Sequence, residues 1–178
     1  MELPEELRNK PPRKPGQEPS AHLTLDAYTR LKAELDELKT EGRTKIAERL
    51  LHARELGDIS ENAEYDAAKN EQGLMEARIR NIERMLRDPD IVEAPVESDK
   101  VAPGMLVTVR PMDDEDPEEE TYLLADSAEE RASGARTITT TSPLGSALVG
   151  ARENEEVAYQ APGGSFRYKV LSFRPASS

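Results

Sequence analysis

Residues 53–72 read ARELGDISENAEYDAAKNEQ, and this stretch decides how the N-terminal half of the chain folds. Gly57 and its polar neighbours interrupt two long charged segments whose apolar residues recur at helical spacing. Only a few residues separate the segments, and a connection that short forces two helices to run antiparallel. The sequence therefore predicts a helical hairpin with residues 57–62 at its free end.

The first helix is predicted over residues 24–56, with Thr24 as a plausible N-cap. Its seam residues recur at steps of three and four: Leu31, Leu35, Leu38, Gly42, Ile46, Leu50 and Ala53. The step from Gly42 to Ile46 is four where a heptad requires three, which is a stutter. Because a glycine inside a helix costs about 1 kcal/mol relative to alanine, we expect local weakness there.

The second helix is predicted over residues 60–87, and Asp88-Pro89 ends it. A sustained heptad seam runs along it: Tyr65, Ala68, Gln72, Met75, Ile79, Ile82 and Leu86. Residues 23–88 are thus expected to form an antiparallel coiled-coil hairpin on the order of 50 Å long.

The segments on either side of this hairpin lack its periodicity. Residues 1–22 contain five prolines, and we expect a disordered tail. Residues 89–104 contain prolines and acidic residues and are predicted to be a linker.

After the linker the pattern changes to short alternating stretches, which predict a small antiparallel β domain over residues 105–175. The expected strands are 105–110, 121–125, 137–141, 157–160 and 166–173. Ser142 and Pro143 favour the start of one short helix that Gly150 closes. The acidic run at 113–120 is read as a solvated hairpin loop, and APGG at 161–164 as a turn. The fold class is therefore α+β.

The amino-acid composition limits the classes of function and partner that suit this chain. The 178-residue chain is 36% hydrophobic and 34% charged, which suits an exposed helical rod with a small core elsewhere. It has no cysteine, no apolar run long enough for a membrane span and no secretory signal, so we expect a cytoplasmic protein. The net charge is −12, of which residues 89–178 carry −9. Duplex DNA is thus a poor partner, and a protein with basic patches is a better one.

The acidic tip has two readings. In the purely structural one, Asp58 caps the second helix and Glu61 completes a capping box, or Ser60 serves as the cap. In the functional one, Asp58 and Glu61 project together as hard oxygen ligands for Mg²⁺. Two carboxylates are too few for a closed site, so another molecule would supply the rest. Arg54 and Lys69, just behind the tip, could hold an RNA phosphate.

The run GD-x-x-ENAEY, with ARIRNIE after it, resembles the bacterial Gre (GreA/GreB) family of transcript cleavage factors, GreA in particular. The later segments VAPGMLVTV, TSPLGSALVG and AYQAPGGSFRYKVLSF resemble that family's C-terminal domain. The resemblance covers roughly residues 23–174. It implies an elongation factor whose hairpin enters the secondary channel of RNA polymerase, and whose FKBP-like β domain docks at the channel rim.

The resemblance also implies roles for particular residues. Asp58 and Glu61 would be the catalytic acids, which help hold a weakly bound Mg²⁺ in the polymerase active site. That metal would activate the water that cleaves backtracked RNA. Arg54 and Lys69 would contact the RNA 3′ segment. The tip would be supported by Gly57, Asn62 and Tyr65, and docking would involve Ser142, Pro143 and Leu144.

Alone, such a chain would be a monomer that binds no cofactor and is not an enzyme. Ser60 and Asp66 stand where some family members have Lys and His, which would weaken RNA contact while leaving metal binding intact. Three alternatives stay open: a channel-binding regulator without cleavage activity, a coiled-coil adaptor or chaperone, and a prolyl isomerase with a helical arm. The small aromatic count, two Phe, five Tyr and no Trp, argues weakly against a prolyl pocket.

Overall fold

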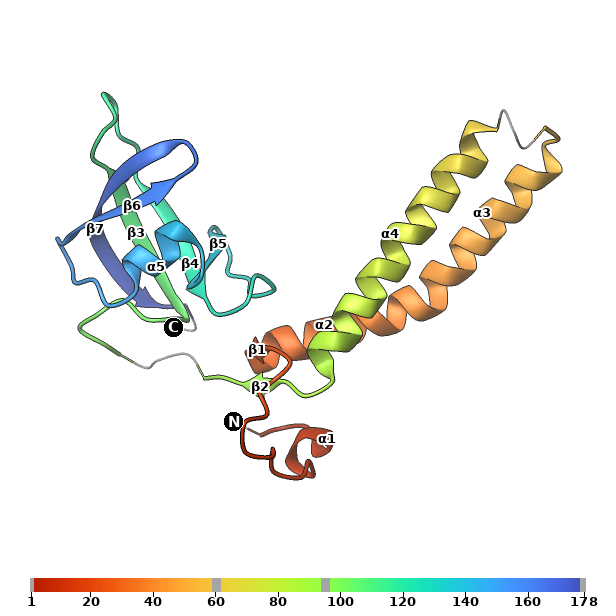
Figure 1. Ribbon diagram of the computed structural model, residues 1–178, viewed down its shortest axis with the longest axis horizontal. Coiled ribbons are helices and arrows are strands. Elements are labelled where there is room, and N and C mark those ends of the chain that lie inside the picture. The colour runs from red at the N-terminus through yellow and green to blue at the C-terminus, as the bar shows by residue number, and fades with distance from the viewer. Residues whose placement is uncertain (1, 59–61, 94–96, 177–178) are drawn as a thin grey trace. The chain divides into compact units, whose positions relative to one another are not determined.

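The computed structural model describes residues 2–58, 62–93 and 97–176 (Figure 1). They divide into two compact units: residues up to 21 together with 28–90, and residues 22–27 together with those from 91 onward. The elements in chain order are α1 (Glu5–Arg8), β1 (His22–Leu23), α2 (Leu25–Glu37), the π-helical turn η1 (Leu38–Gly42), α3 (Arg43–Glu55), α4 (Ala63–Leu86), β2 (Asp90–Ile91), β3 (Met105–Pro111), β4 (Glu120–Ala125), β5 (Arg136–Thr139), α5 (Pro143–Leu148), β6 (Glu156–Ala161) and β7 (Gly164–Pro175).

The predicted hairpin is confirmed. Helices α3 and α4 lie side by side and meet at the tip (Figure 1). All the predicted seam residues of both arms are buried or half-buried. Ion pairs between the arms follow antiparallel order: Lys39 with Glu83, Arg43 with Glu76, and Arg49 with Glu71. Exposed pairs of this kind stabilise by at most about 1 kcal/mol each, so the buried seam does most to hold the hairpin.

The stutter at Gly42 coincides with the π-helical turn η1, which the sequence did not predict. A π turn takes one more residue than an α turn, so it can absorb the four-residue step and return Ile46 to the seam. A Cβ added at Gly42 would lie 3.0 Å from the Sδ of Met75. The glycine therefore lets the two arms approach closely at this level.

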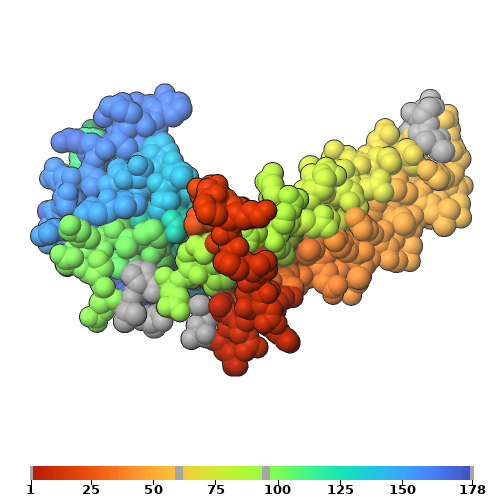
Figure 2. All heavy atoms as spheres, turned by 60° about the horizontal axis from the view of Figure 1, so that its bottom comes forward, coloured from red at the N-terminus to blue at the C-terminus, as the bar shows by residue number. Residues whose placement is uncertain are grey.

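The tail differs from the disordered segment expected from its composition. In the first unit it lies against the base of the hairpin (Figure 2), and four of its residues form α1. Glu6 accepts a hydrogen bond from the Tyr28 hydroxyl at 2.9 Å. Arg13 donates to the Asp88 carboxylate at 2.7 Å and to the Pro89 carbonyl at 2.9 Å. Ser20 donates to the carbonyl of Met85 at 2.7 Å. Carbonyl groups at a helix C-terminus need donors, and the tail supplies them.

The β domain contains all five predicted strands in one sheet, in the order β5-β4-β3-β7-β6. We expected an antiparallel sheet. Strands β4 and β5 are instead parallel, with Tyr122 opposite Arg136, so the sheet is mixed. The segment 126–135 returns the chain to the starting end of β4 before β5 begins, whereas the short turn at Pro162-Gly163 makes β6 and β7 antiparallel. The acidic run does connect the antiparallel strands β3 and β4.

Helix α5 covers part of this sheet. Ser142 caps it by accepting a hydrogen bond from the Gly145 backbone N–H at 3.1 Å, and Pro143 opens it, as predicted. Leu144 and Leu148 pack in one buried cluster with Val157 and Val170.

The predicted linker also contains structure, because its strand β2 forms a two-stranded sheet with β1. Across the described ranges, no helix is long and apolar enough to span a membrane.

Candidate functional site at the hairpin tip

Gly57 ends the first arm. The backbone N–H of Leu56 donates to the His52 carbonyl at 3.2 Å, and that of Gly57 donates to the Arg54 carbonyl at 3.5 Å. Gly57 has φ +108°, in the left-handed region that commonly follows a helix C-terminus. A side chain there would strain the backbone. The glycine therefore turns the chain away from α3, as expected of a residue that supports the tip.

Asn62 begins the second arm. Its side-chain oxygen accepts hydrogen bonds from the backbone N–H groups of Glu64 at 3.1 Å and Tyr65 at 3.2 Å. Its Nδ2 donates to the carbonyl of Ala53, on the opposite arm. One side chain thus caps α4 and fastens it to α3.

The capping reading of the acids is therefore wrong for Asp58. The N-cap is Asn62, four residues later, and α4 begins at Ala63 instead of residue 60. Ser60 and Glu61 lie outside the described residues, so their predicted roles remain predictions. Asp58 itself is exposed and lies just after the helix-ending glycine.

An exposed carboxylate of this kind suits Mg²⁺, which takes one or two carboxylates and keeps several waters. Within the described parts of the chain, no three Asp, Glu, His or Cys side chains gather into a metal site. The Mg²⁺ site at Asp58 and Glu61 remains a prediction, because Glu61 lies outside the described residues.

The two predicted RNA-contacting residues flank the tip on different arms. The guanidinium of Arg54 lies over the ring of Tyr65, 5.8 Å from its centroid, so Tyr65 supports this cation. The Nζ of Lys69 donates to the Oε1 of Gln72 at 3.0 Å. Both side chains are exposed, and both can still reach an anion.

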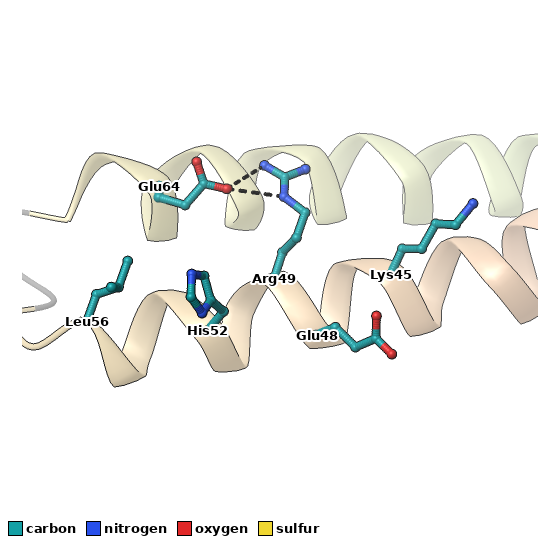
Figure 3. Close-up of a pocket in the computed structure, with 6 residues that line it drawn as sticks. All are labelled: Lys45, Glu48, Arg49, His52, Leu56 and Glu64. Carbon is teal, nitrogen blue, oxygen red and sulfur yellow. Dashed lines mark hydrogen bonds and ion pairs between the residues drawn. The ribbon is translucent and has the colours of Figure 1, made fainter.

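A groove of about 570 Å³ runs along the arms behind the tip (Figure 3). Its lining residues are Lys45, Glu48, Arg49, His52, Leu56 and Glu64. Arg49 donates to Glu64 across the hairpin at 2.9 Å. This groove was not predicted from the sequence. Its signal was the spacing of Lys45, Arg49 and His52, four and three residues apart, which places basic side chains on one helical face.

Comparison with known proteins identifies the family. Residues 21–91 match the model of the N-terminal domain of GreA/GreB transcription elongation factors, and residues 96–175 match that of their C-terminal domain. The transcription elongation factor GreA of Thermotoga neapolitana is 43% identical over 149 residues, which cover 84% of this chain and 94% of that protein. The chain belongs to the GreA/GreB family.

A second GreA protein agrees with this family assignment. GreA of Roseiflexus castenholzii is 43% identical over 155 residues, which cover 86% of this chain and 97% of that protein. Among solved structures, GreA factor homolog 1 of Thermus thermophilus is 25% identical, with a TM-score of 0.39 and coverage of 86% of this chain and 98% of that one. The tail up to residue 20 lies outside both matched domains.

The docking residues expected from the GreA/GreB resemblance are not equally accessible. Pro143 is exposed. Ser142 is half-buried, and its side chain caps α5. Leu144 is only 8% exposed and packs in the core, so it offers a partner almost no surface. The docking role of all three residues remains a prediction, for which Pro143 offers the most exposed side chain.

Proposed function

We propose that this GreA/GreB-family chain enters the secondary channel of RNA polymerase with its hairpin and stimulates the polymerase's own Mg²⁺-dependent cleavage of backtracked RNA. The observation that carries the proposal is the cap at the tip. The N-cap of α4 is Asn62, so the exposed Asp58 is not the capping residue of that helix. An exposed acid at the end of a rod is placed to reach a site inside another molecule.

In this proposal the chain contributes ligands and the polymerase contributes the active site. The carboxylates of Asp58 and Glu61 would help hold a Mg²⁺ ion that the polymerase also binds. Such an ion lowers the pKa of a bound water and so generates a nucleophile. The Asn62 side chain donates to Ala53 on α3 and accepts from Glu64 on α4, and so would steady the end of the arm that precedes Asp58.

The basic residues behind the tip would hold the extruded RNA. Arg54 is steadied by the ring of Tyr65, and Lys69 lies on the other arm. A phosphate group of the RNA bound between Arg54 and Lys69 would lie behind Asp58 and Glu61, away from the end of the tip. The β domain would meet the polymerase at the channel rim, with Ser142 and Pro143 as candidate contacts. We infer that the chain acts as a monomer and is not catalytic alone.

The test is RNA cleavage in a stalled, backtracked elongation complex containing Mg²⁺. Wild type is compared with the double variant Asp58→Asn/Glu61→Gln. The matched control is Glu48→Gln/Glu55→Gln, which removes the same charge from two exposed acids on the arm behind the tip. Polymerase binding is measured for each protein.

We expect wild type and the control to shorten the transcript, and the tip variant to bind without stimulating cleavage. If all three proteins bind and none stimulates cleavage, the chain is a channel-binding regulator and the proposed mechanism is wrong. If the tip variant cleaves as well as wild type, Asp58 and Glu61 have no role at the metal.

A further inference from the structure

The hairpin of β6 and β7 carries an apolar face that continues beyond helix α5. Val157 and Val170 on this face are buried under Leu144 and Leu148. Side chains two apart along a strand share a face, so the same face continues to Tyr159, Phe166 and Tyr168, which we call the aromatic ladder.

The aromatic ladder is well ordered by its own contacts. Tyr159 stacks on Phe166 with ring centroids 5.4 Å apart, and on Tyr168 at 6.0 Å. Exposure increases toward the turn, where Phe166 is 36% exposed. Aromatic pairs of this kind add about 0.5–1.5 kcal/mol beyond burial. The ladder is therefore a preformed platform, and its outer ring is open to a partner.

An acidic loop is attached beside the ladder. We use that name for residues 113–119, between β3 and β4. The backbone N–H of Arg167 donates to Asp113 at 3.2 Å, and its guanidinium donates to the same carboxylate at 2.6 Å. The N–H of Met112 donates to the Arg167 carbonyl at 2.9 Å. Arg167 lies between Phe166 and Tyr168 in β7, with its side chain on the other face of the strand, so these bonds hold the start of the loop against the strand that carries the ladder. The β3–β4 connection and the β6–β7 turn lie at the same end of the domain (Figure 1).

Four acids of this loop are not neutralised. Asp114, Glu115, Asp116 and Glu118 are exposed and make no ion pair with any residue that the structure describes. Burial raises the pKa of Tyr168, Tyr159 and Glu120 raise it further, and Asp114 of this loop adds the smallest contribution.

The charge and the exposed rings of this surface indicate what kind of partner it would bind. Four uncompensated carboxylates repel phosphate groups, so a nucleic acid is disfavoured although bases can stack on aromatic rings. A segment that carries lysine or arginine would be attracted to the loop, and its cations and aliphatic stems would pack on the exposed rings.

We propose that the aromatic ladder and the acidic loop together form a surface that docks on a lysine- and arginine-bearing protein segment of RNA polymerase. The choice of polymerase rests on the proposed function. This surface is separate in sequence from the Ser142–Pro143 loop and adds a second contact to the β domain.

The test measures the Kd of the full-length chain for core RNA polymerase at low and high salt. One variant removes loop charge, Asp114→Asn/Glu115→Gln/Asp116→Asn. Its matched control, Glu93→Gln/Glu97→Gln/Glu153→Gln, removes three exposed acids elsewhere in the same unit. A third variant, Phe166→Ala, truncates the outer ring. Thermal unfolding of each protein shows whether the domain is intact.

We expect the loop variant to weaken binding roughly tenfold at low salt and much less at high salt, because salt screens exposed charges. Phe166→Ala should weaken binding about fivefold at both salt concentrations, because it removes apolar contact area. The control triple should bind like wild type.

Other outcomes overturn the proposal. Wild-type affinity in both the loop variant and Phe166→Ala would show that the surface is not a docking site, while the proposed function would stand. A loss of binding to short single-stranded RNA on Phe166→Ala, with polymerase binding unchanged, would favour base stacking instead. Failure of the wild-type chain to bind polymerase would overturn the proposed function and this partner together.

Discussion

The side chain of Asn62 joins the two arms of the hairpin, because its amide donates to the Ala53 carbonyl on α3 while its oxygen caps α4. The two residues are nine positions apart in sequence. This contact ties the start of α4 to the end of α3.

Replacing Asn62 should therefore loosen the tip. Asn62→Ala removes the cap and the contact between the arms, and we expect a loss of about 2 kcal/mol in the free energy of unfolding. Asn62→Asp keeps the capping oxygen but loses the donor, so its loss should be smaller. Urea denaturation, monitored by the circular dichroism signal of the helices, measures the free energy of unfolding of both variants.

The control for this prediction is Asn70→Ala. Asn70 is exposed inside α4, where alanine is the better helix former. A loss for Asn62→Ala no larger than that for Asn70→Ala would show that the contact does not matter for stability.

Gly145 should tolerate no side chain. A Cβ at this position would lie 1.9 Å from the Thr139 carbonyl oxygen, which is backbone and cannot move aside cheaply. We expect Gly145→Ala to destabilise the β domain by roughly 3 kcal/mol. The neighbouring change Ser146→Ala, on an exposed position of α5, should stay within about 0.5 kcal/mol of wild type. Thermal unfolding compares the two, and equal stability would contradict the steric argument.

Glu130 should stabilise the second unit, to which Thr24 also belongs. Its carboxylate is buried and accepts hydrogen bonds from the Thr24 backbone N–H at 2.8 Å and the Thr24 hydroxyl at 2.7 Å. Glu130→Ala leaves both donors without this acceptor, and we expect a loss of about 2–3 kcal/mol. Glu153→Ala, which removes an exposed acid of the same unit, should have little effect. Chemical denaturation measures the free energy of unfolding of both variants, and equal losses would contradict a specific role for Glu130.

Attachment of the tail to the hairpin base should depend on pH. Arg13 lowers the pKa of Asp88 through a hydrogen bond, and Lys32 lowers that of Glu6 in the same way. Because both folded-state pKa values are depressed, the stabilisation is fully present above the unfolded values, which are about 4. It is lost as the pH falls through the folded values. We expect limited proteolysis of residues 1–20 to be slow at neutral pH and fast in acid.

Two variants test which contact matters for the tail. Arg13→Ala should expose the tail to protease even at neutral pH. Lys14→Ala removes the same charge one position later, where the side chain is exposed, and should leave the tail protected. Equal cleavage rates for the two variants at neutral pH would exclude a specific role for Arg13.

Much of the fold followed from local pattern. The heptad seam predicted both arms of the hairpin, alternation predicted all five strands of the large sheet, and Ser142 with Pro143 predicted the start of α5. These features depend on residues a few positions apart, whose periodicity decides which face is buried. The GD-x-x-ENAEY run likewise sufficed to indicate the family.

Only the tertiary structure showed which residues far apart in the sequence bind each other. It also showed which of several neighbouring polar residues caps a helix. Several residues near the tip can cap a helix, and Asn62, which caps α4, also donates a hydrogen bond to Ala53 on the other arm. Arg13 meets Asp88 and Glu130 meets Thr24 across long separations that no local period encodes. The parallel pairing of β4 with β5 depends on the path of the connecting loop. The physical reason is the same in each case. Local spacing determines which side chains share a face of a helix or strand. Burial and hydrogen bonding with the opposite element determine which of those side chains form tertiary contacts.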